Sequence, residues 1–413
     1  MIVFITDELP KSGAAGHLAF NHAVISWLRA EGHDVTVMLT GMRLTAPVER
    51  YELARVCGPH VRSIGGYTAA TPRAAGRIVS RTLLRCLPVS LAGRLRQIQH
   101  QSHTLLGKFP RPAEIRWCAR AIGKLKPEAV LIDTIFRAPL LAEAELAGLN
   151  RILITHDVFY HRAEALQAAG YQVRPEGLTR QREAQLLAHA GHIAAIQPEE
   201  AGLLREMCPQ ANVFTAAMPA LPCPPAPKTK KVAGRLVFVG SDSLPNLDGL
   251  RWFLTDIWPE LRGHGITLDL IGDCGPALRR LPPGVNALGR LPDLAPVLHR
   301  AAIAISPLRA GSGLKIKLLD YARHGLFTVA TPPSLQGFDD DPESPFIIAG
   351  SAGMFAEAVL RHVAVPQSPE TALAYVSRHY DPESAFSGLR DALKQPRCTA
   401  QSKQPNTPIG LLP

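Results

Sequence analysis

The fold is decided by the stretch Ile303-Ala-Ile-Ser-Pro-Leu-Arg-Ala-Gly-Ser-Gly-Leu-Lys-Ile-Lys-Leu-Leu-Asp320. Its first four residues are apolar or small and predict a buried strand that ends at Ser306. Gly311 and Gly313 predict a tight turn in which the backbone comes close to a ligand. A helix is expected from Gly313 to His324. The stretch therefore predicts a strand, a glycine-containing loop and a helix, which is the repeating unit of a parallel sheet.

The start of this predicted helix has the chemistry of an anion site. Free N–H groups at a helix N-terminus favour an anion such as a diphosphate, and Lys315 and Lys317 add positive charge there. Asp320 lies about two turns further on, where a carboxylate would accept hydrogen bonds from ribose hydroxyls. The alternative interpretation is an ordinary glycine-capped helix with surface lysines.

Apolar strands alternate with helices along the rest of the chain, which predicts parallel sheets with both faces covered. The expected strands are 2–5, 35–39, 129–133, 151–155, 192–196, 213–216, 235–240, 266–271, 303–306 and 328–331. The expected helices are 17–29, 175–189, 198–207, 247–261, 294–300 and 313–324. The fold class is therefore α/β.

Prolines interrupt this alternation in the segment from Pro219 to Lys231. Such a segment forms a stiff, extended connector, so we expect an N-terminal domain over 1–218, a linker over 219–233 and a C-terminal domain over 234–395. The polar tail 396–413 is expected to be disordered. Two similar α/β halves predict a ligand in the cleft between them, at the carboxyl ends of the strands.

The positive charge of the chain, +10 overall, is concentrated between Thr71 and Lys126, where twelve basic residues stand against one acid, Glu114. Arg77, Arg81 and Arg85 recur every four residues and share one helical face. A basic amphipathic helix favours an anionic membrane surface; the alternative is a solvated arginine face. Few aromatic residues accompany the patch, so nucleic acid is not an expected partner.

Composition and motifs narrow the class of protein further. Hydrophobic residues make up 46% and charged residues 19%, which excludes a largely disordered chain. The sequence contains no apolar run of the ~18 residues that span a bilayer. The start lacks a basic leader, and the 7 Cys lack the spacing of zinc or redox pairs. We therefore expect a cytoplasmic protein with reduced thiols.

Cofactor chemistry finds little support in the loops. The glycines of the Gly13–His17 loop fall short of a dinucleotide fingerprint, which argues against NAD. His156 and His161 follow a predicted strand, and each would suit a metal, a base or a loop cap. For His156 we favour a polar contact to substrate. Three convergent metal ligands and an Asp-x-Asp motif are not apparent, so neither a metal nor an obligatory cofactor is expected.

Several motifs occur together in the C-terminal half. They are Val237-Phe-Val-Gly-Ser241, Pro245-Asn-Leu-Asp-Gly-Leu-Arg-Trp-Phe253, Trp258-Pro259, Leu270-Ile-Gly272, Leu288-Gly-Arg290 and the stretch from Ser306 to Ala322. Their order and spacing over residues 235–340 resemble group 1 (family 4) glycosyltransferases. The N-terminal half resembles this family more loosely. The resemblance implies the GT-B fold, in which two Rossmann-like domains face each other across a cleft.

The resemblance also implies transfer of a sugar, with retention, from a nucleotide-diphosphate donor to a saccharide or lipid-linked acceptor in bacterial surface polysaccharide or glycolipid synthesis. Such an enzyme would work on the inner face of the membrane. By position, the catalytic residues would be His156, Lys315 and Asp320. The donor-binding residues would be Gly240, Ser241, Gly311, Ser312, Gly313, Leu314, Lys315, Lys317 and Asp320. The acceptor-binding residues would be Gly13, Gly16 and His17.

Two departures from the family pattern are visible. Ser312 stands where the family often has a Glu, and Ser241-Asp-Ser243 replaces the Arg and Lys that commonly follow the glycine of the first strand in this half. They motivate an alternative function, an inactive scaffold or partner subunit that binds a sugar nucleotide. A sugar-nucleotide epimerase of similar architecture is a third candidate.

Overall fold

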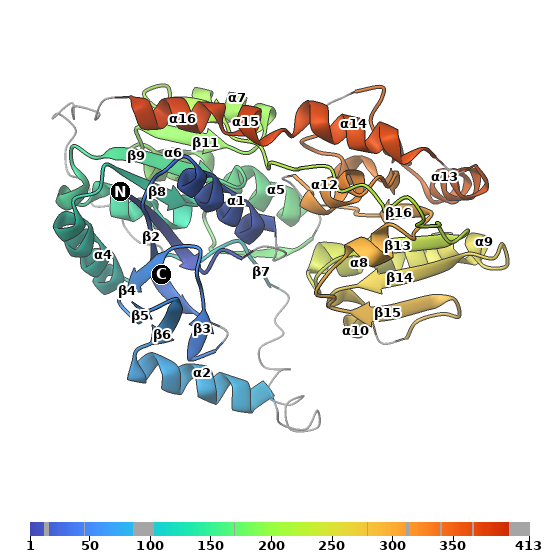
Figure 1. Cartoon of the computed structure of the whole chain (residues 1–413), viewed down its shortest axis with the longest axis horizontal. Helices are drawn as coiled ribbons and strands as arrows, with labels where there is room; N and C mark the ends of the chain where they lie inside the picture. Colours follow the sequence, from blue (N-terminus) through green and yellow to red (C-terminus); the bar gives the residue numbers. More distant parts are fainter. Residues whose placement is uncertain are drawn as a thin grey trace. The chain divides into compact units, whose positions relative to one another are not determined.

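The computed structural model describes residues 1–11, 16–44, 46–85, 103–168, 170–278, 280–310, 314–338, 341–365 and 367–395; of 42–43, 81–85 and 103–104 it describes the backbone. The chain divides into two compact units (Figure 1). The N-terminal unit comprises Met1–Ala216 and the chain from Phe386 onward, and the C-terminal unit comprises Ala217–Ala385.

The N-terminal unit is built on a sheet with the strand order β12-β11-β9-β8-β1-β2-β4-β5-β6-β3. Its strands from β12 to β4 are parallel, and β4, β5, β6 and β3 pair in antiparallel fashion. The bounds are β1 Ile2–Glu8, β2 Val35–Arg43, β3 Val48–Arg50, β4 Arg55–Gly58, β5 Val61–Ile64, β6 Tyr67–Ala70, β8 Ala129–Asp133, β9 Asn150–Thr155, β11 His192–Ala195 and β12 Asn212–Thr215. A separate pair joins β7 (His103–Leu105) to β10 (Gln172–Arg174).

Helices pack against this sheet, and its apolar strands supply the buried core of the unit. The helical elements are α1 Gly16–Ala30, α2 Pro72–Arg85, α4 Pro112–Leu125, α5 Phe159–Ala168, α6 Arg180–Leu187, α7 Pro198–Met207 and α16 Ser387–Lys394, with 3₁₀ turns at Ile135–Ala142 and Ala144–Leu146. β1 and β8 are buried from their first apolar residue to their last. Strands of this kind require cover on both faces.

The C-terminal unit holds a parallel sheet with the strand order β15-β14-β13-β16-β17-β18. The bounds are β13 Arg235–Val239, β14 Thr267–Ile271, β15 Val285–Gly289, β16 Ile303–Ser306, β17 Thr328–Ala330 and β18 Phe346–Ile348. Counted along the unit, these strands lie in the order 3-2-1-4-5-6, the order of a Rossmann dinucleotide-binding fold. The unit is therefore Rossmann-like by topology as well as by composition.

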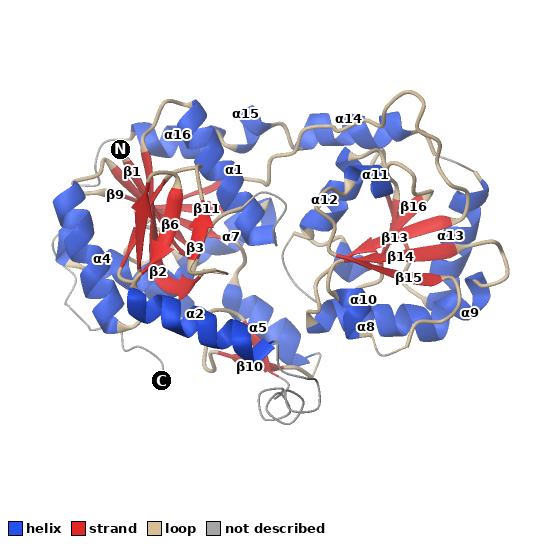
Figure 2. Ribbon diagram, turned by 60° about the horizontal axis from the view of Figure 1, so that its bottom comes forward, coloured by secondary structure: helices blue, strands red, loops and turns tan. Residues whose placement is uncertain are grey.

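Helices cover both faces of this second sheet (Figure 2). Leu236 and Phe238 of β13 pack on the face covered by α8 and α13, while Val237 packs on the face covered by α11 and α12. Alternating contacts of this kind follow from the two-residue period of a strand. The bounds are α8 Leu244–Trp252, a π-helical turn Phe253–Ile257, α9 Trp258–Leu261, α10 Cys274–Ala277, α11 Ala295–Leu298, α12 Ile316–Arg323, a 3₁₀ turn Pro332–Ser334, α13 Ala352–Ala364, α14 Pro369–His379 and α15 Pro382–Ala385.

Several predicted bounds need correction. The helix predicted for 175–189 is confined to Arg180–Leu187, because Thr179 caps its start by accepting a hydrogen bond from Arg182 N. The helix predicted from Gly313 begins at Ile316. The strands β3, β5 and β6 were not predicted, because each has at most one buried residue and so lacks a buried apolar run.

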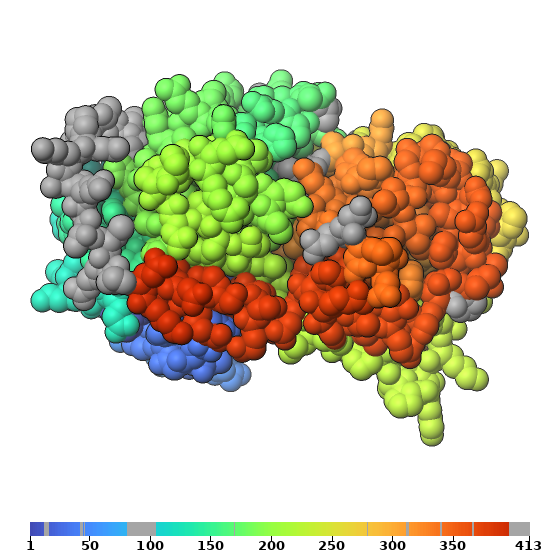
Figure 3. All heavy atoms as spheres, turned by 90° about the horizontal axis from the view of Figure 1, so that it is seen from above, coloured from blue at the N-terminus to red at the C-terminus, as the bar shows by residue number. Residues whose placement is uncertain are grey.

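The end of the described chain returns to the N-terminal unit, which corrects the predicted domain 234–395. α16 contacts β11 and β12 and lies, in red, beside the yellow-green residues of that unit (Figure 3). Asn150 Nδ2 donates to Ala392 O at 2.8 Å, and Phe386 packs 5.3 Å from the ring of Trp27. Residues 386–395 thus belong to the core of the N-terminal unit. The tail 396–413, predicted to be disordered, lies outside the described residues.

The proline-rich segment is hydrogen-bonded near both of its ends to the C-terminal unit, and the predicted linker 219–233 is part of that unit. Ala220 N donates to Tyr380 O at 2.8 Å, Cys223 N to Arg323 O at 2.7 Å and Val232 N to Arg300 O at 2.8 Å. Proline fixes an extended backbone but removes a donor, and here the donors of intervening residues make the contacts. Of the described helices, none is long and apolar enough to cross a bilayer.

Candidate functional site

Each sheet has one place where the strand order reverses, and polar residues gather there in both units. In the N-terminal unit the reversal lies between β1 and β8, and in the C-terminal unit it lies between β13 and β16. The loops that leave such a pair of strands diverge to opposite faces and open a crevice at the carboxyl ends, where ligands of α/β folds bind.

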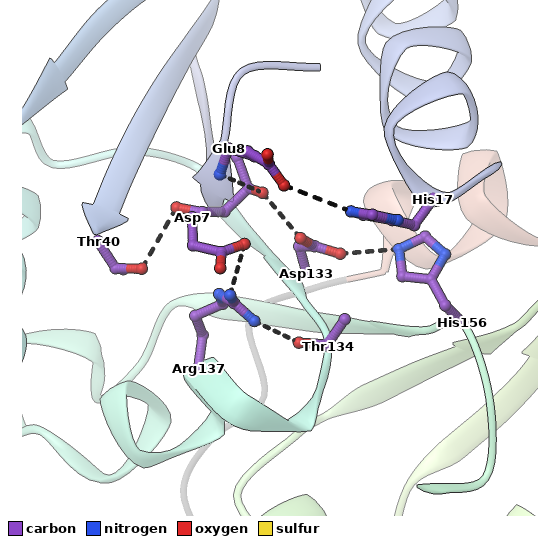
Figure 4. A network of polar contacts seen from close by, with 9 residues as sticks. Asp7, Glu8, His17, Thr40, Asp133, Thr134, Arg137 and His156 are labelled. Atoms are coloured by element: carbon purple, nitrogen blue, oxygen red, sulfur yellow. Dashed lines mark hydrogen bonds and ion pairs between the residues drawn. The ribbon is translucent and has the colours of Figure 1, made fainter. Parts of the chain in front are cut away.

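Asp133 is the centre of the N-terminal site (Figure 4). It is the last residue of β8 and is 1% exposed. Thr6 Oγ1 donates to one of its carboxylate oxygens at 2.7 Å, and Nε2 of His156, the residue that follows β9, lies 2.7 Å from the other. Burial alone would raise the pKa of Asp133, but the hydrogen bond and charge of His156, with the charge of Arg137, hold that pKa below its usual range. Asp133 therefore stays ionised and fixes the orientation of the His156 ring.

A buried arginine completes this network. Arg137 is 3% exposed; it pairs with Asp7 Oδ1 at 2.6 Å and donates to Thr134 Oγ1 at 2.5 Å. Thr134 has φ 63, in the left-handed region, where a β-branched residue is strained by about 1–3 kcal/mol. The backbone N–H of Thr134 donates to Ile154 O at 2.9 Å. These bonds hold a strained residue in place directly beside Asp133.

The predicted acceptor residue His17 lies beside His156. The two rings are 6.0 Å apart, edge to face, and Phe20 from α1 packs 5.4 Å from His156. Nε2 of His17 is 3.8 Å from Glu8 Oε2. Gly16 begins α1, whereas Gly13 lies outside the described residues. His161, the other histidine considered from sequence, is exposed on α5.

Glu183 fixes the loop that carries His156. This fully buried side chain of α6 accepts hydrogen bonds from Phe159 N at 3.0 Å and Tyr160 N at 2.6 Å, at the start of α5. Burial raises the pKa of Glu183 to about 7, although the two backbone hydrogen bonds oppose the rise. A carboxylate at a helix N-terminus stabilises that end. The sequence did not identify Glu183, Asp133, Asp7 or Arg137; the signal available for Asp7 and Asp133 was an acid at or just after an apolar run.

Lys317 is the centre of the C-terminal site. It rises from α12, and its Nζ donates to Asn246 Oδ1 at 2.8 Å and lies 4.1 Å from the centre of the Phe238 ring. Asn246 of α8 donates in turn to Ser241 O at 3.2 Å. The N-cap residue of α8 is Ser243. Asn246 instead links Lys317 to the loop that follows β13.

Gly240 is required at the end of β13. A methyl group there would lie 2.6 Å from Cε1 of Phe238 and 3.1 Å from Nδ2 of Asn246. Any side chain at this position would therefore displace the two groups that hold Lys317. Ser241, which follows, is exposed.

Burial changes the protonation of two residues of α12. It lowers the pKa of Lys317 to about 7, so the ammonium loses much of its charge near neutral pH. The Asp320 side chain is 39% exposed, with Arg323 NH1 3.9 Å from its carboxylate. Burial raises the pKa of Asp320. Tyr321 ties α12 to the sheet, because its hydroxyl accepts a hydrogen bond from Val239 N at 2.6 Å.

Hydrogen bonds from residues that follow β17 hold the loop after β16 in place. Ser334 Oγ donates to Ser306 O at 2.7 Å and accepts from Leu308 N at 3.3 Å, and the Thr331 hydroxyl donates to Leu308 O. Leu314 is half-buried and Lys315 is the N-cap residue of α12. The predicted phosphate-binding residues Gly311, Ser312 and Gly313 lie outside the described residues.

The two Rossmann-like units, with polar groups at each reversal point, define a protein of the GT-B class of folds. Solved structures agree. The chain is 14% identical to a sucrose-phosphate synthase from Thermosynechococcus elongatus, with a TM-score of 0.64 over 94% of this chain and 97% of that one. The glycosyltransferase WaaG, involved in lipopolysaccharide biosynthesis, is 14% identical, with a TM-score of 0.55 over 96% and 97%. HepE of Anabaena, in complex with UDP, is 12% identical, with a TM-score of 0.58 over 95% and 99%.

Residues 233–364, which lie within the C-terminal unit, match the family model described as Glycosyl transferases group 1. A protein of Klebsiella pneumoniae, described as an uncharacterized 44.6 kDa protein in the cps region, is 24% identical over 172 residues. That match covers 37% of this chain and 44% of the relative's length.

Proposed function

We propose that this protein is a glycosyltransferase that moves a sugar from a nucleotide-diphosphate donor to an acceptor, with retention of configuration. One observation carries the proposal: a half-buried lysine, Lys317, is held at the carboxyl end of β13 by Asn246, in a domain that matches the group 1 family model. This position is where α/β folds bind nucleotides. A half-buried cation there has the chemistry to hold a diphosphate.

Lys317 would act on the leaving group. Charge builds on the diphosphate as the bond to the sugar breaks, and a cation already in place lowers the barrier without reorganisation. Because the pKa of Lys317 is about 7 without a ligand, an arriving diphosphate would raise it and draw a proton onto the amine. Lys315 would add charge, and Asp320 would accept hydrogen bonds from the ribose.

In the N-terminal unit, His156 would bind the reacting sugar and Asp133 would position it. Asp133 occupies Nε2 of His156, which leaves Nδ1 to meet a sugar hydroxyl. A fixed ring loses little entropy when it binds, so such a contact is worth more than one from a mobile side chain. His17 and Gly16, at the start of α1, would contact the acceptor.

Similar proteins suggest the donor and the acceptor. HepE was solved with UDP and with UDP and glucose, and TarM of S. aureus with fondaparinux, alpha-GlcNAc-glycerol and UDP. We extend this to a uridine diphosphate donor and a saccharide or lipid-linked acceptor. The Klebsiella relative belongs to a cps region, which agrees with a role in bacterial surface polysaccharide synthesis.

Binding of purified protein to nucleotides tests the proposal. UDP and UDP-sugars at about 100 times their dissociation constant should stabilise the protein by about 2.7 kcal/mol, which a thermal-shift measurement detects. Transfer or slow hydrolysis of a UDP-sugar should accompany binding. Binding without turnover would indicate the scaffold alternative, and a new sugar nucleotide formed without acceptor would indicate an epimerase. No response to any nucleotide would contradict the proposal.

We also propose that the enzyme works at a membrane surface through α2. Arg73 and Arg77 are exposed on this helix, Ala74 and Ile78 are buried against the unit, and Val79 is 46% exposed. Arg81 and Arg85 continue the helix, but their side chains lie outside the described residues. Exposed arginines beside an apolar residue favour anionic lipid headgroups.

Flotation with vesicles containing anionic lipid tests this surface. Changing Arg77, Arg81 and Arg85 to Ala should abolish binding at physiological salt, since each basic residue near the surface is worth about 1 kcal/mol. A control variant removes the same charge from the C-terminal unit, at the exposed residues Arg251, Arg262 and Arg361. Equal binding by both variants would contradict the proposed surface.

A further inference from the structure

Three metal-ligating side chains meet in the C-terminal unit, away from the proposed donor site. Cys223 lies in the proline-rich segment, His299 follows α11 and His324 follows α12. Their ligand atoms all lie within 4.8 Å of one another. In the described part of the chain, this is the one such group of three. We propose that Cys223, His299 and His324 form a zinc site that fastens the proline-rich segment to the end of α12.

Each of the two imidazoles has one ring nitrogen beside a backbone carbonyl. Nε2 of His299 lies 2.9 Å from Cys223 O, and Nδ1 of His324 lies 2.8 Å from Asp320 O. A carbonyl oxygen only accepts, so in each ring this nitrogen carries the proton and the other nitrogen keeps its lone pair. Metal-bound histidines commonly donate their second ring N–H to such a partner, which fixes the tautomer and the ring orientation.

The ligand set selects the metal. One thiolate and two imidazoles suit zinc and disfavour magnesium and calcium, which prefer oxygen. Bonds of about 2.0–2.3 Å to zinc place ligand atoms roughly 3.5 Å apart, so the side chains must rotate slightly inward from their present separations. Three protein ligands leave a fourth tetrahedral position for water.

The surroundings tolerate a cation. His324 is the C-cap residue of α12, and the carbonyl end of a helix carries partial negative charge. Two cations are adjacent to the ligands in sequence. Arg300, after His299, is exposed. Arg323, before His324, is engaged, because Nε donates to Leu221 O at 3.1 Å and NH1 is 3.9 Å from the Asp320 carboxylate. A zinc ion would therefore meet a thiolate and a helix end.

The segment that the metal would fasten is the same one that the sequence predicted to be a linker. Cys223 N already donates to Arg323 O at 2.7 Å, so the zinc would reinforce an existing contact. α12 also carries Lys317 and Asp320. Zinc would thus hold the far end of the helix that presents the proposed donor-binding residues, and its binding does not depend on the proposed enzymatic function.

Metal titration of the full-length protein tests the site. The protein is freed of metal with a chelator, titrated with Co²⁺ while its absorption is recorded, and then titrated with Zn²⁺ to displace the cobalt. We expect one metal ion per chain, a thiolate-to-cobalt charge-transfer band and the visible bands of a tetrahedral site. Zn²⁺ should also raise the midpoint of thermal unfolding, because the ion binds only the folded site.

Matched variants decide which residues hold the ion. Cys223→Ser should remove the charge-transfer band, and both Cys223→Ser and His299→Gln should weaken Zn²⁺ binding by about 100-fold or more. The control Cys57→Ser, at a half-buried cysteine of the N-terminal unit, should keep the charge-transfer band and the affinity for Zn²⁺. Circular dichroism checks that each variant is folded. Failure of the wild-type protein to bind Zn²⁺, or a charge-transfer band that survives Cys223→Ser, would overturn the proposal.

Discussion

At the scale of single residues, Lys317 illustrates a conflict between stability and binding. Its folded pKa of about 7 lies below the unfolded value of 10.5, so keeping the amine charged costs free energy in the folded protein at any pH below the unfolded value. A residue that weakens the free protein in this way is typical of a binding site.

We therefore expect Lys317→Met to separate the two properties. The free energy of unfolding of the variant should be about 1 kcal/mol higher than that of wild type, as is common when a functional residue is replaced by one that favours stability. The variant should bind UDP about 10–100-fold more weakly, because it loses a charged hydrogen bond. Calorimetric titration and urea unfolding measure both. The exposed Lys124→Met serves as control and should change neither. A variant that binds UDP as wild type does would remove Lys317 from the donor site.

The same residue predicts a pH dependence of UDP binding. Binding requires the protonated amine, and Lys317 loses its proton as the pH rises through about 7. UDP affinity should therefore fall from pH 7 to pH 9, with proton uptake detected as a dependence of the binding enthalpy on buffer. Lys317→Met should lose this dependence. Identical buffer dependence in wild type and variant would contradict the assignment.

Asp133 predicts a pH effect of the opposite kind, on stability. Its folded pKa lies below the unfolded value, so the ionised carboxylate stabilises the fold above about pH 4, and this contribution is lost as the pH falls through the folded pKa. Asp133→Asn should cost about 3 kcal/mol at pH 7, because it removes a buried carboxylate that accepts a hydrogen bond from Thr6 Oγ1 and offsets the charge of Arg137. Urea unfolding should show that the difference in stability between wild type and Asp133→Asn becomes smaller in acid.

The matched control is an exposed ion pair. Asp273 and Arg290 are bonded through two oxygens, but the Arg290 side chain is 81% exposed. Asp273→Asn should change stability little, because solvent screens such a pair. If both Asp variants lose the same stability, burial is not what gives the Asp133 pair its strength.

At the scale of elements, the positions of helices against the sheet depend on glycines. A methyl group at Gly249 in α8 would lie 2.5 Å from Pro307 O, in the loop after β16, and 3.0 Å from Pro307 C. Both atoms are backbone, so α8 itself must move. Because α8 also carries Asn246, that shift would reach Lys317.

Gly249→Ala should therefore lower stability by about 1–3 kcal/mol and weaken UDP binding. Gly202→Ala is the control, since a methyl group there meets nothing within 4 Å and Gly202 lies inside α7. That change should raise stability by about 0.5–1 kcal/mol, because alanine favours helix. Thermal unfolding compares the two; a neutral Gly249→Ala would show that α8 is free to move.

Element prediction succeeded where apolar runs were long. The helix 198–207 and the strands 129–133 and 303–306 agree with the structure at both ends. Short strands with exposed faces, such as β5 and β18, were not predicted, because their pattern of apolar and polar residues does not differ from that of a loop. The start of α12 was misplaced because a glycine loop next to a helix does not reveal where hydrogen bonding begins.

At the scale of the whole molecule, the chain crosses back to its first unit near Phe386. Arg390 pairs with Glu31 at 3.0 Å and stacks 5.5 Å from the Trp27 ring. A methyl group at Gly388 would lie 2.6 Å from the Phe214 ring. The N-terminal unit is therefore built from both ends of the described chain.

Truncation after Ala385 should destabilise the N-terminal unit and spare the C-terminal unit. Deleting α16 exposes the aromatic cluster around Trp27, and losing one buried aromatic side chain alone costs about 3–5 kcal/mol. Scanning calorimetry should show one transition shifted to lower temperature. A truncation after Gln395 keeps these contacts and is the control. Equal shifts from both truncations would place the stabilising contacts beyond residue 395.

The sequence by itself determined what depends on neighbours along the chain: apolar runs that become buried strands, the α/β class, the glycine at 240 and the motifs of the C-terminal half. Only the tertiary structure decided which distant groups meet. Asp7 and Arg137 pair across the reversal of one sheet, Lys317 meets Asn246 across that of the other, and Cys223, His299 and His324 converge from three segments. The physical reason is that local patterns specify faces and periods, whereas strand order and helix docking, which bury the most apolar surface, set the distances between chemical groups.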